Sequence, residues 1–196
     1  RLHPSIRAQE HPFTIASSAY SGAWTEFTIR HRGDFTHTLS QLPPGSPVWV
    51  DGPHGAFSVD LKPTTGLVMI AGGVGIAPMM SMLRTLAHRH DRRPHRLIVV
   101  ARTTDDLLFR AELTTLQQHL DLTIIELLRQ PPPDWTGATG TIDEHLLTTL
   151  LPGKFRRNQL DYFLCGPPTL IHHTLTILDH LAIPHPRIHT EQFDLV

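Results

Sequence analysis

The sequence of 196 residues is poor in cysteine and has no surplus of charge of either sign. Its single cysteine, Cys165, excludes an internal disulfide framework and cannot supply the four thiolates of an iron–sulfur cluster. The 17 Lys and Arg residues are balanced by 18 Asp and Glu residues, so the sequence lacks the basic surplus of a nucleic-acid-binding protein. No apolar run approaches the ~20 residues of a membrane-spanning helix, and the polar, proline-containing start does not predict a signal peptide.

Histidine, by contrast, is abundant, with 15 residues. No HExxH segment and no Cys/His quartet occurs, and His172 and His173 are neighbours on an expected helix, where adjacent side chains point in different directions. A metal site needs convergent ligands. We therefore expect solvated histidines and no resident metal ion.

Residues 12–60 have the composition of β-structure. Short runs rich in β-branched and aromatic residues occur at 13–17, 24–30 and 48–50, and are separated by Ser-Gly, Pro-Pro-Gly and Gly-Pro turns. A short helix is expected over 35–41. Three strands are too few to close a barrel, and an open sheet of this size leaves unpaired edges. We therefore predict that residues 1–62 are a partial antiparallel β-barrel that lacks its first strands, and that the chain is a fragment of a longer protein.

The pattern changes near residues 62–66. Strands are predicted at 67–71, 97–101, 122–127, 162–165 and 188–193, and they alternate with helices at 76–88, 105–119, 143–150 and 168–180. The first strand is a continuous apolar run, as expected of a strand buried on both faces. Strands that alternate with helices are typical of a parallel sheet covered on both faces. Residues 63–196 are therefore predicted to be an α/β nucleotide-binding domain.

A glycine-rich turn follows the first apolar strand and precedes a helix, with glycine at positions 72, 73 and 75. A helix N-terminus favours an anion, and glycine lets a phosphate approach the backbone closely. The spacing is not the GxGxxG of the usual dinucleotide fingerprint. Taken alone, the turn is equally compatible with a phosphate site and with a tight connection that binds nothing.

Cys165, Gly166 and Pro167 stand at the end of the fourth predicted strand. Ligands of open α/β sheets bind beyond the carboxyl ends of the strands, so this segment should face the same crevice as the glycine turn. Taken alone, a single cysteine is more often a small buried apolar residue.

Six segments occur in a characteristic order: HPFT, GDFT, GPHGAF, GGVGIAP, CGPP and EQF. With these segments the chain resembles, over most of residues 9–193, the dehydrogenase region of the ferredoxin–NADP reductase superfamily. Within it, the chain is most similar to the ferric reductase and NADPH oxidase branch. The resemblance implies FAD held between a β-barrel and a nicotinamide-binding domain, with NADPH as the reductant and NADH as a possible one.

The resemblance also implies roles for particular residues. His11 and Arg30 would contact the flavin pyrophosphate or ribityl chain, Phe13 would pack against the isoalloxazine, and Thr14 would hydrogen-bond near flavin N5. Pro12 would also contact the cofactor. Gly33 and Thr36 would form a second pyrophosphate contact. The dinucleotide would lie against Gly72, Gly73, Gly75, Cys165, Gly166 and Pro167. Thr14, Cys165, Glu191 and Phe193 would form the catalytic set, with the Phe193 ring covering the flavin until nicotinamide displaces it.

Two arginines bear on the choice of nucleotide. Arg102 follows the second predicted α/β strand and Arg110 lies one helical segment later. Arginine suits a 2′-phosphate, and no acidic residue directly follows that strand, where NAD-specific folds often place one. The pattern favours NADPH; the alternative is that both arginines are simply solvated.

The implied function is that of an FAD-dependent NAD(P)H oxidoreductase. Hydride passes from NAD(P)H to FAD, and single electrons pass on to an acceptor. In the ferric reductase and oxidase branch the acceptor is haem in a preceding transmembrane domain, which implies a soluble segment on the cytoplasmic side of a larger membrane protein. Two alternatives stay open: a soluble reductase serving a ferredoxin or an oxygenase, and a non-catalytic module that senses the dinucleotide.

Overall fold

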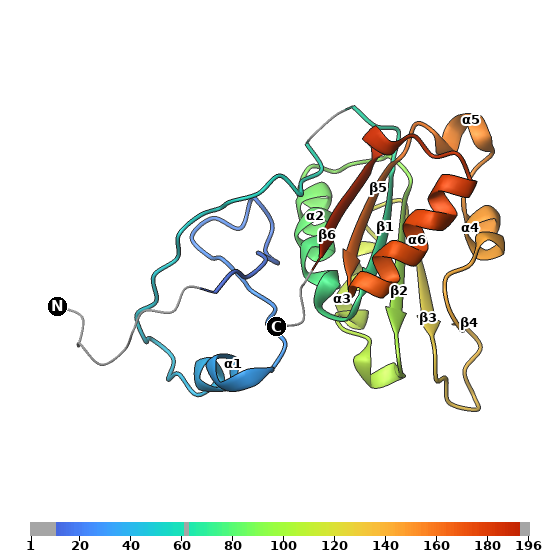
Figure 1. Cartoon of the computed structure of the whole chain (residues 1–196). Helices are drawn as coiled ribbons and strands as arrows, with labels where there is room; N and C mark the ends of the chain where they lie inside the picture. The colour runs from blue at the N-terminus through green and yellow to red at the C-terminus, as the bar shows by residue number, and fades with distance from the viewer. Residues whose placement is uncertain (1–10, 61–62, 193–196) are drawn as a thin grey trace.

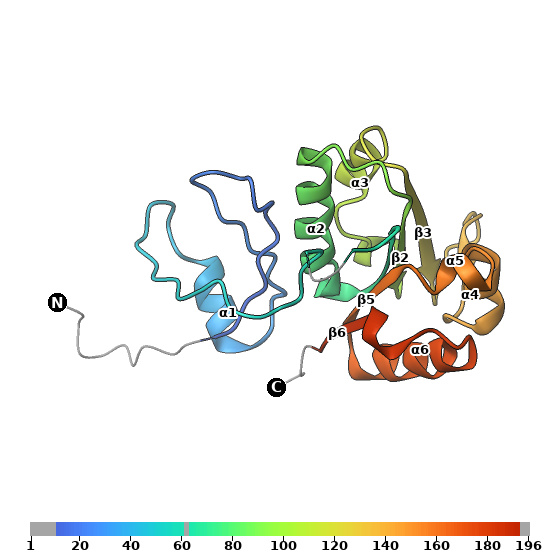
Figure 2. The same cartoon turned by 90° about the horizontal axis from the view of Figure 1, so that it is seen from above.

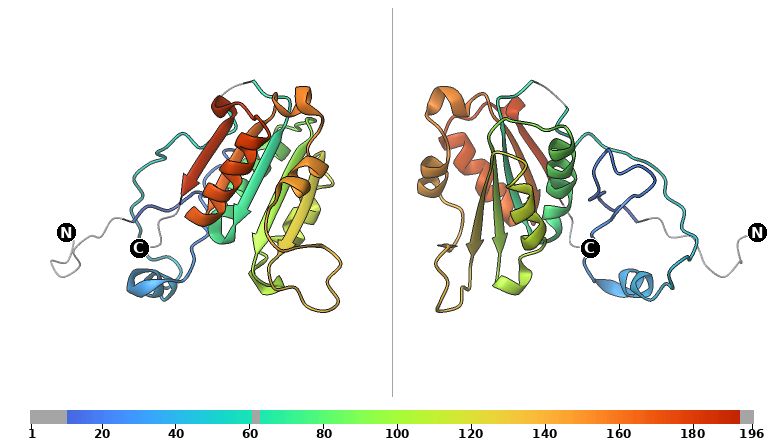
Figure 3. Two further views of the ribbon diagram at one scale, coloured as in Figure 1. Left: turned by 45° about the vertical axis from the view of Figure 1, so that its right-hand side comes forward. Right: turned by 180° about the vertical axis from the view of Figure 1, so that it is seen from behind.

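The computed structural model describes residues 11–60 and 63–192. Residues 63–192 form a layered α/β domain, and residues 11–60 lie beside it as mostly irregular chain with one helix, α1 (Gly33–Ser40) (Figure 1). The two regions meet along α2 and near β6, as the turned views also show (Figure 3).

The sheet has six strands in the order β4-β3-β2-β1-β5-β6, and all of them run parallel. The strands are β1 (Leu67–Gly72), β2 (His95–Ala101), β3 (Leu122–Leu128), β4 (Ala138–Thr139), β5 (Asp161–Gly166) and β6 (Ile188–Gln192). After β1 the chain builds the sheet in one direction and then returns to add β5 and β6 on the other side of β1. The strand order therefore reverses between β1 and β5, where open α/β sheets bind their ligands.

Helices cover both faces of the sheet, as the view from above shows (Figure 2). Helices α2 (Ile76–His88) and α3 (Arg110–Leu116) lie on one face, and α4 (Glu144–Leu150), α5 (Lys154–Arg157) and α6 (Pro168–His180) lie on the other side. Short 3₁₀ turns are η1 (Gly73–Gly75), η2 (Thr104–Asp106) and η3 (His185–Arg187).

Strand alternation divides the core between these two faces. Met69 and Phe163 pack with Met79 and Leu83 of α2 on one face, and Ile70 and Leu164 lie in the apolar cluster on the other. Every residue of β1 and β5 is buried. For β1 this confirms the prediction from its uninterrupted apolar sequence.

The predicted α/β arrangement is confirmed, and the predicted helices at 76–88 and 168–180 have the observed bounds of α2 and α6. The predicted helix at 105–119 is wrong as a single element. Thr103 and Asp106 form a capping box that starts η2, and Phe109 then adopts a left-handed conformation with φ of 61°, so α3 begins only at Arg110. The sequence did not predict β4 or α5.

The strands predicted at 13–17, 24–30 and 48–50 are not formed in the described part of the chain. One antiparallel bridge joins Ile15 to Phe27, and Trp49 has 81% of its surface exposed. Short strands need neighbours to complete their hydrogen bonds and cover an apolar face, and residues 11–60 offer few. The helix predicted at 35–41 is present as α1 and begins two residues earlier, at Gly33.

Among the helices of the described residues, none has the length and apolar character needed to cross a membrane. Within residues 11–60 and 63–192 no group of three or more His, Cys, Asp or Glu side chains could hold a metal ion.

Candidate functional site

The carboxyl ends of β1 and β5 approach each other closely because glycine occupies the contact points. A Cβ atom on Gly75 would lie 2.2 Å from the carbonyl oxygen of Cys165, and one on Gly166 would lie 3.1 Å from the backbone nitrogen of Gly72. A side chain at Gly75 would therefore push the two loops apart. The close packing of these two loops therefore requires glycine at this point, whether or not a ligand binds.

Gly73 differs from the glycines on either side of it. Its φ is +57°, it is exposed, and a Cβ atom would meet nothing within 4 Å. Helix α2 begins just after it, with no side-chain cap and no acidic residue in its first turn. The positive end of the helix dipole is thus not offset by a local carboxylate, and the open backbone beside Gly73 suits a phosphate group.

The structure brings together three of the four residues predicted to be catalytic. Cys165 of β5 pairs in register with Glu191 of β6, and the Thr14 hydroxyl donates to Glu191 Oε1 at 3.5 Å, across 177 positions in the sequence. The fourth residue, Phe193, lies outside the described residues. The cluster lies at the carboxyl end of β5, directly beside the glycine turn.

Burial controls the charge of this cluster. Cys165 is fully buried; burial raises the pKa of its thiol, and the Glu191 carboxylate adds to the rise. Burial also raises the pKa of Glu191, while the hydrogen bond from Thr14 opposes that rise. Cys165 therefore stays a neutral thiol near pH 7 and lacks the thiolate character of a nucleophile.

Aromatic rings gather around the first predicted flavin segment. The rings of His11 and Phe35 stack with centroids 3.8 Å apart, and Phe13 lies 6.1 Å from Phe35 at an interplanar angle of 17°. Sequence reasoning proposed His11 and Phe13 but missed Phe35. Its aromatic character within the GDFT segment was the available signal.

The remaining residues predicted to contact the flavin lie around α1. Pro12 and Arg30 are exposed, and Gly33 starts α1 with φ of +72°. The Thr36 hydroxyl donates to the Arg32 carbonyl and accepts from its N–H at 2.6 Å. Thr36 therefore ties the start of α1 to the preceding residue.

The two arginines predicted to face the nucleotide lie in different surroundings, Arg102 in the loop after β2 and Arg110 at the start of α3. Arg102 is exposed. Arg110 donates from Nε and Nη2 to the carboxylate of Glu126 at 2.8 and 2.9 Å. Asp106, which sequence reasoning missed, folds back onto Thr103, and hydrogen bonds from that residue lower its pKa. A carboxylate thus lies close to the end of β2 although it is not adjacent in sequence.

A six-stranded parallel sheet with a glycine turn where the strand order reverses defines a nucleotide-binding α/β domain. The family model described as the oxidoreductase NAD-binding domain matches residues 69–176, more than half of the chain, and the chain belongs to this family. It is an NAD-binding oxidoreductase domain of the ferredoxin–NADP reductase superfamily and is similar to cytochrome b5 reductases.

Curated relatives include an NADH-cytochrome b5 reductase 1 from Laccaria bicolor, 30% identical over 79% of this chain and 51% of the relative. Another is the reductase component of propane 2-monooxygenase from Rhodococcus jostii, 27% identical over 98% of this chain and 53% of the relative. The chain thus spans about half the length of the curated relatives it matches.

A solved structure, the CS-b5R domains of human Ncb5or in the NAD⁺ form, superposes with a TM-score of 0.75 at 26% identity, covering 94% of this chain and 57% of the other. The cytochrome b5 reductase domain of Ulva prolifera nitrate reductase, at 23% identity and a TM-score of 0.71, shares the fold over 90% of this chain and 71% of that one. These matches support the superfamily and do not single out the ferric reductase and NADPH oxidase branch.

Proposed function

We propose that the chain is the nucleotide-binding part of an FAD-dependent NAD(P)H oxidoreductase that passes hydride from NAD(P)H to FAD and then single electrons to an acceptor. The observation that carries this proposal is the hydrogen bond from Thr14 to Glu191 beside Cys165. The two residues are 177 positions apart in the sequence. A protein that merely sensed a dinucleotide would not need this set in addition to the glycine turn.

The residues fit a bound dinucleotide. Gly73 supplies open backbone at the start of α2, which suits the pyrophosphate. Gly72 and Gly75 hold this turn against Cys165 and Gly166, so Gly166 and Pro167 would border the nicotinamide end. The small, neutral and buried side chain of Cys165 would line the site there and keep water from the reacting atoms.

The residues also fit a flavin, although this chain provides only part of a flavin domain. The stacked rings of His11, Phe13 and Phe35 form a flat aromatic surface on which an isoalloxazine or adenine ring could stack. Arg30, Gly33, Thr36 and Pro12 would contact the rest of the cofactor. Bound FAD supplies two-electron acceptance of hydride and one-electron release. In the chain itself, Thr14 and Glu191 would orient the reacting edge.

We assign residues 1–62 to the partial flavin-binding region and residues 63–196 to the NAD(P)-binding domain. Few residues of 11–60 are buried, and Trp24 and Trp49 are 79% and 81% exposed. We therefore expect this chain to bind FAD weakly. Phe193 would cover the flavin from the other end of the chain.

The acceptor proposed from the sequence is haem of an associated transmembrane domain. The relatives favour a second candidate, because they are named as reductases of cytochrome b5 and of a monooxygenase. We propose a one-electron acceptor protein of these kinds, and the test is electron delivery to a purified b-type cytochrome or to an oxygenase component.

For the nucleotide, we propose that both NADH and NADPH are used. Exposed Arg102 is available for a 2′-phosphate, whereas the Arg110 guanidinium is bound to Glu126. Asp106 near the same loop favours the free ribose hydroxyls of NADH. Replacing Arg102 with Ala should raise the KM for NADPH and leave that for NADH unchanged.

Anaerobic bleaching of flavin tests the activity. The chain is mixed with excess FAD and then with NADH or NADPH, and the oxidised flavin absorbance is followed, with a control that lacks protein. Protein-dependent bleaching is the expected result. Nucleotide binding without bleaching would favour the sensing module, and absence of both would reject the proposal.

A further inference from the structure

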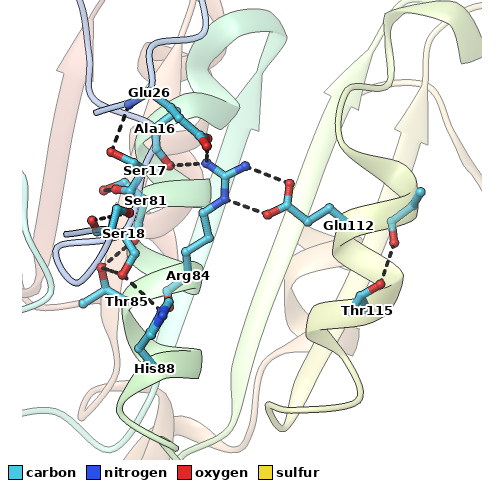
Figure 4. A network of polar contacts seen from close by, with 12 residues as sticks. Ala16, Ser17, Ser18, Glu26, Ser81, Arg84, Thr85, His88, Glu112 and Thr115 are labelled. Atoms are coloured by element: carbon cyan, nitrogen blue, oxygen red, sulfur yellow. Dashed lines mark hydrogen bonds and ion pairs between the residues drawn. The ribbon is translucent and has the colours of Figure 1, made fainter. Parts of the chain in front are cut away.

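Helix α2 has two stripes of side chains at helical spacing. The apolar stripe, which includes Met79 and Leu83, packs on the sheet. The second stripe is polar and faces residues 16–26 (Figure 4). It consists of Ser81, Arg84, Thr85 and His88.

The polar stripe binds the backbone that leads away from Thr14. The Ser81 hydroxyl donates to the Ser17 carbonyl at 2.7 Å, and the Ala19 N–H donates to the Thr85 hydroxyl at 3.0 Å. The segment bound in this way is itself paired with the next stretch of chain, since the Ala16 N–H donates to the Glu26 carbonyl at 2.7 Å. Side chains of one helix thus fix the backbone of a region that has no sheet of its own.

Arg84 makes the most connections in this network (Figure 4). Its Nη1 donates to the Ala16 carbonyl at 2.7 Å and to Glu26 Oε2 at 2.8 Å. Its Nε and Nη2 donate to the two carboxylate oxygens of Glu112 in α3, at 2.6 and 2.8 Å. The planar guanidinium therefore joins three parts of the protein: residues 16–26, α2 and α3.

The surroundings make these bonds strong. The Arg84 side chain is only 16% exposed, and its guanidinium lies 5.6 Å from the centre of the Phe109 ring. Low exposure strengthens charge-assisted bonds and makes the loss of one partner costly. A lysine cannot reproduce this geometry, because its ammonium lacks the planar fork that reaches a carbonyl and two carboxylates at once.

The position of Arg84 connects the two halves of the proposed reaction site. Helix α2 begins at the glycine turn, and Arg84 lies eight residues beyond Ile76, about 12 Å along the helix. The Ala16 carbonyl that it binds is two residues from Thr14, about 7 Å along extended chain. Moving this carbonyl would move Thr14 relative to Glu191 and to the glycine turn.

We propose that Arg84 is a positioning residue for hydride transfer: by holding the Ala16 backbone to α2, it sets where Thr14 lies relative to the nucleotide turn. This inference rests on the proposed NAD(P)H-flavin reductase function. The residue acts on the chemical step through geometry and makes no contact with substrate.

The test compares Arg84→Met with Arg89→Met. Arg89 is a matched control because it directly follows α2 and, like Arg84, binds residues of the 11–60 region, here Asp60 and Tyr20, with its guanidinium 5.5 Å from the Tyr20 ring. Arg89 does not bind the Ala16 backbone beside Thr14: its partner Tyr20 is six positions from Thr14, and Asp60 is remote from it in sequence. Arg84→Lys serves as a second variant that keeps the charge, in case the methionine variant does not fold.

Two readouts are needed. In single-turnover flavin reduction with excess FAD, we expect Arg84→Met to slow the reduction step about 10- to 100-fold. A displacement of Thr14 by about 1 Å or less is enough for a loss of this size. The KM for NADH should change by no more than about twofold, because the nucleotide turn is untouched. In the cofactor-free chain, hydrogen exchange should quicken at the Ala16 and Ala19 amides. Arg84→Lys should be intermediate and Arg89→Met close to wild type in the reduction rate.

Equal slowing in the Arg84 and Arg89 methionine variants would overturn the inference, because any loosening of residues 11–60 would then suffice. A change in melting temperature alone, with the reduction rate kept, would also overturn it. Wild-type chain that binds nucleotide but does not bleach flavin would reject the proposed function and this inference together, whereas an active wild type with an unaffected Arg84→Met variant rejects only the inference.

Discussion

Residues 63–192 and residues 11–60 use different interactions to hold their structure. In the first region all of β1 and β5 is buried, and apolar side chains fill both faces of the sheet. In the second, four residues are buried: Ala16, Ser17, Ser18 and Val59. Three of these four adjoin the polar stripe of α2. Hydrophobic burial therefore defines one region, and hydrogen bonds to its neighbour define much of the other.

This difference has a consequence for function. The glycine turn and Cys165 belong to the region with its own core, so their geometry is fixed by packing. Thr14 and the stacked rings belong to the region held by polar contacts. Polar contacts with partial exposure have lower local stability than a packed core. The flavin half of the site should therefore be the more easily disturbed half.

The largest loss of folding stability is expected from a substitution that leaves a cavity in the apolar core against the sheet. Phe163 is 1% exposed and packs edge-on against Phe57, with ring centroids 5.2 Å apart. Phe163→Ala should lower the free energy of unfolding by about 3–5 kcal/mol, measured by urea denaturation. Phe155→Ala is the control, because Phe155 is 80% exposed, and it should change stability by no more than about 0.5 kcal/mol. Similar losses in both variants would contradict the idea that the core stabilises this region.

A smaller effect is expected at the junction of β1 and β5. Gly75→Ala places a Cβ atom 2.2 Å from the Cys165 carbonyl oxygen. The two loops must move apart to accommodate it, which should lower the free energy of unfolding by about 1–3 kcal/mol. It should also weaken NAD(P)H binding, measured by calorimetry, because the loops that face the dinucleotide separate. Gly153→Ala is the matched control, since a Cβ atom there meets nothing within 4 Å and φ is −52°. Unchanged binding in Gly75→Ala would place the nucleotide elsewhere.

The contrast between the two regions also explains which sequence predictions succeeded. Uninterrupted apolar strands such as β1 determine their own burial, and α2 has apolar residues at helical spacing, so local pattern was sufficient for both. The run at 48–50 has strand-like composition, but a strand also requires a partner, and composition does not reveal whether one exists. Left-handed Phe109, which splits the helix predicted at 105–119, has no local signal in the sequence.

The same reasoning applies to the candidate site. Its short motifs indicated Thr14, Cys165 and Glu191, and the contact between Thr14 and Glu191 agrees with their predicted convergence. Arg84 carries no motif, and its importance comes from three partners that are remote in sequence. A residue whose partners are brought to it by tertiary packing could not be predicted from periodicity alone.

Acid should lower the folding stability of the α/β region because Asp91 becomes protonated. Burial of Asp91 opposes its ionisation, but hydrogen bonds from Arg93 prevail and lower its pKa to about 2. The unfolded value is about 3.9. Because the folded pKa is depressed, the stabilisation is complete above pH ~4 and is lost as the pH falls toward 2, with a magnitude on the order of 2 kcal/mol. Urea denaturation from pH 6 to 2 measures the loss. Asp91→Asn should flatten the curve in this window, and an unchanged slope would exclude Asp91 as its source.

The smallest change in stability is expected where the two regions meet at the site. The hydrogen bond from Thr14 to Glu191 is long, at 3.5 Å, and partly buried, so Thr14→Val should cost no more than about 1 kcal/mol of folding free energy. It should nevertheless raise the pKa of Glu191 further, because the bond that opposes the effect of burial is lost. Glu191 would then titrate at higher pH, and the acid limb of the flavin-reduction rate should move upward with it. Thr14→Ser keeps the hydroxyl and should keep the wild-type profile. If both variants shift the profile equally, the hydroxyl is not the group that sets the charge of Glu191, and the two regions are coupled at the site by packing alone.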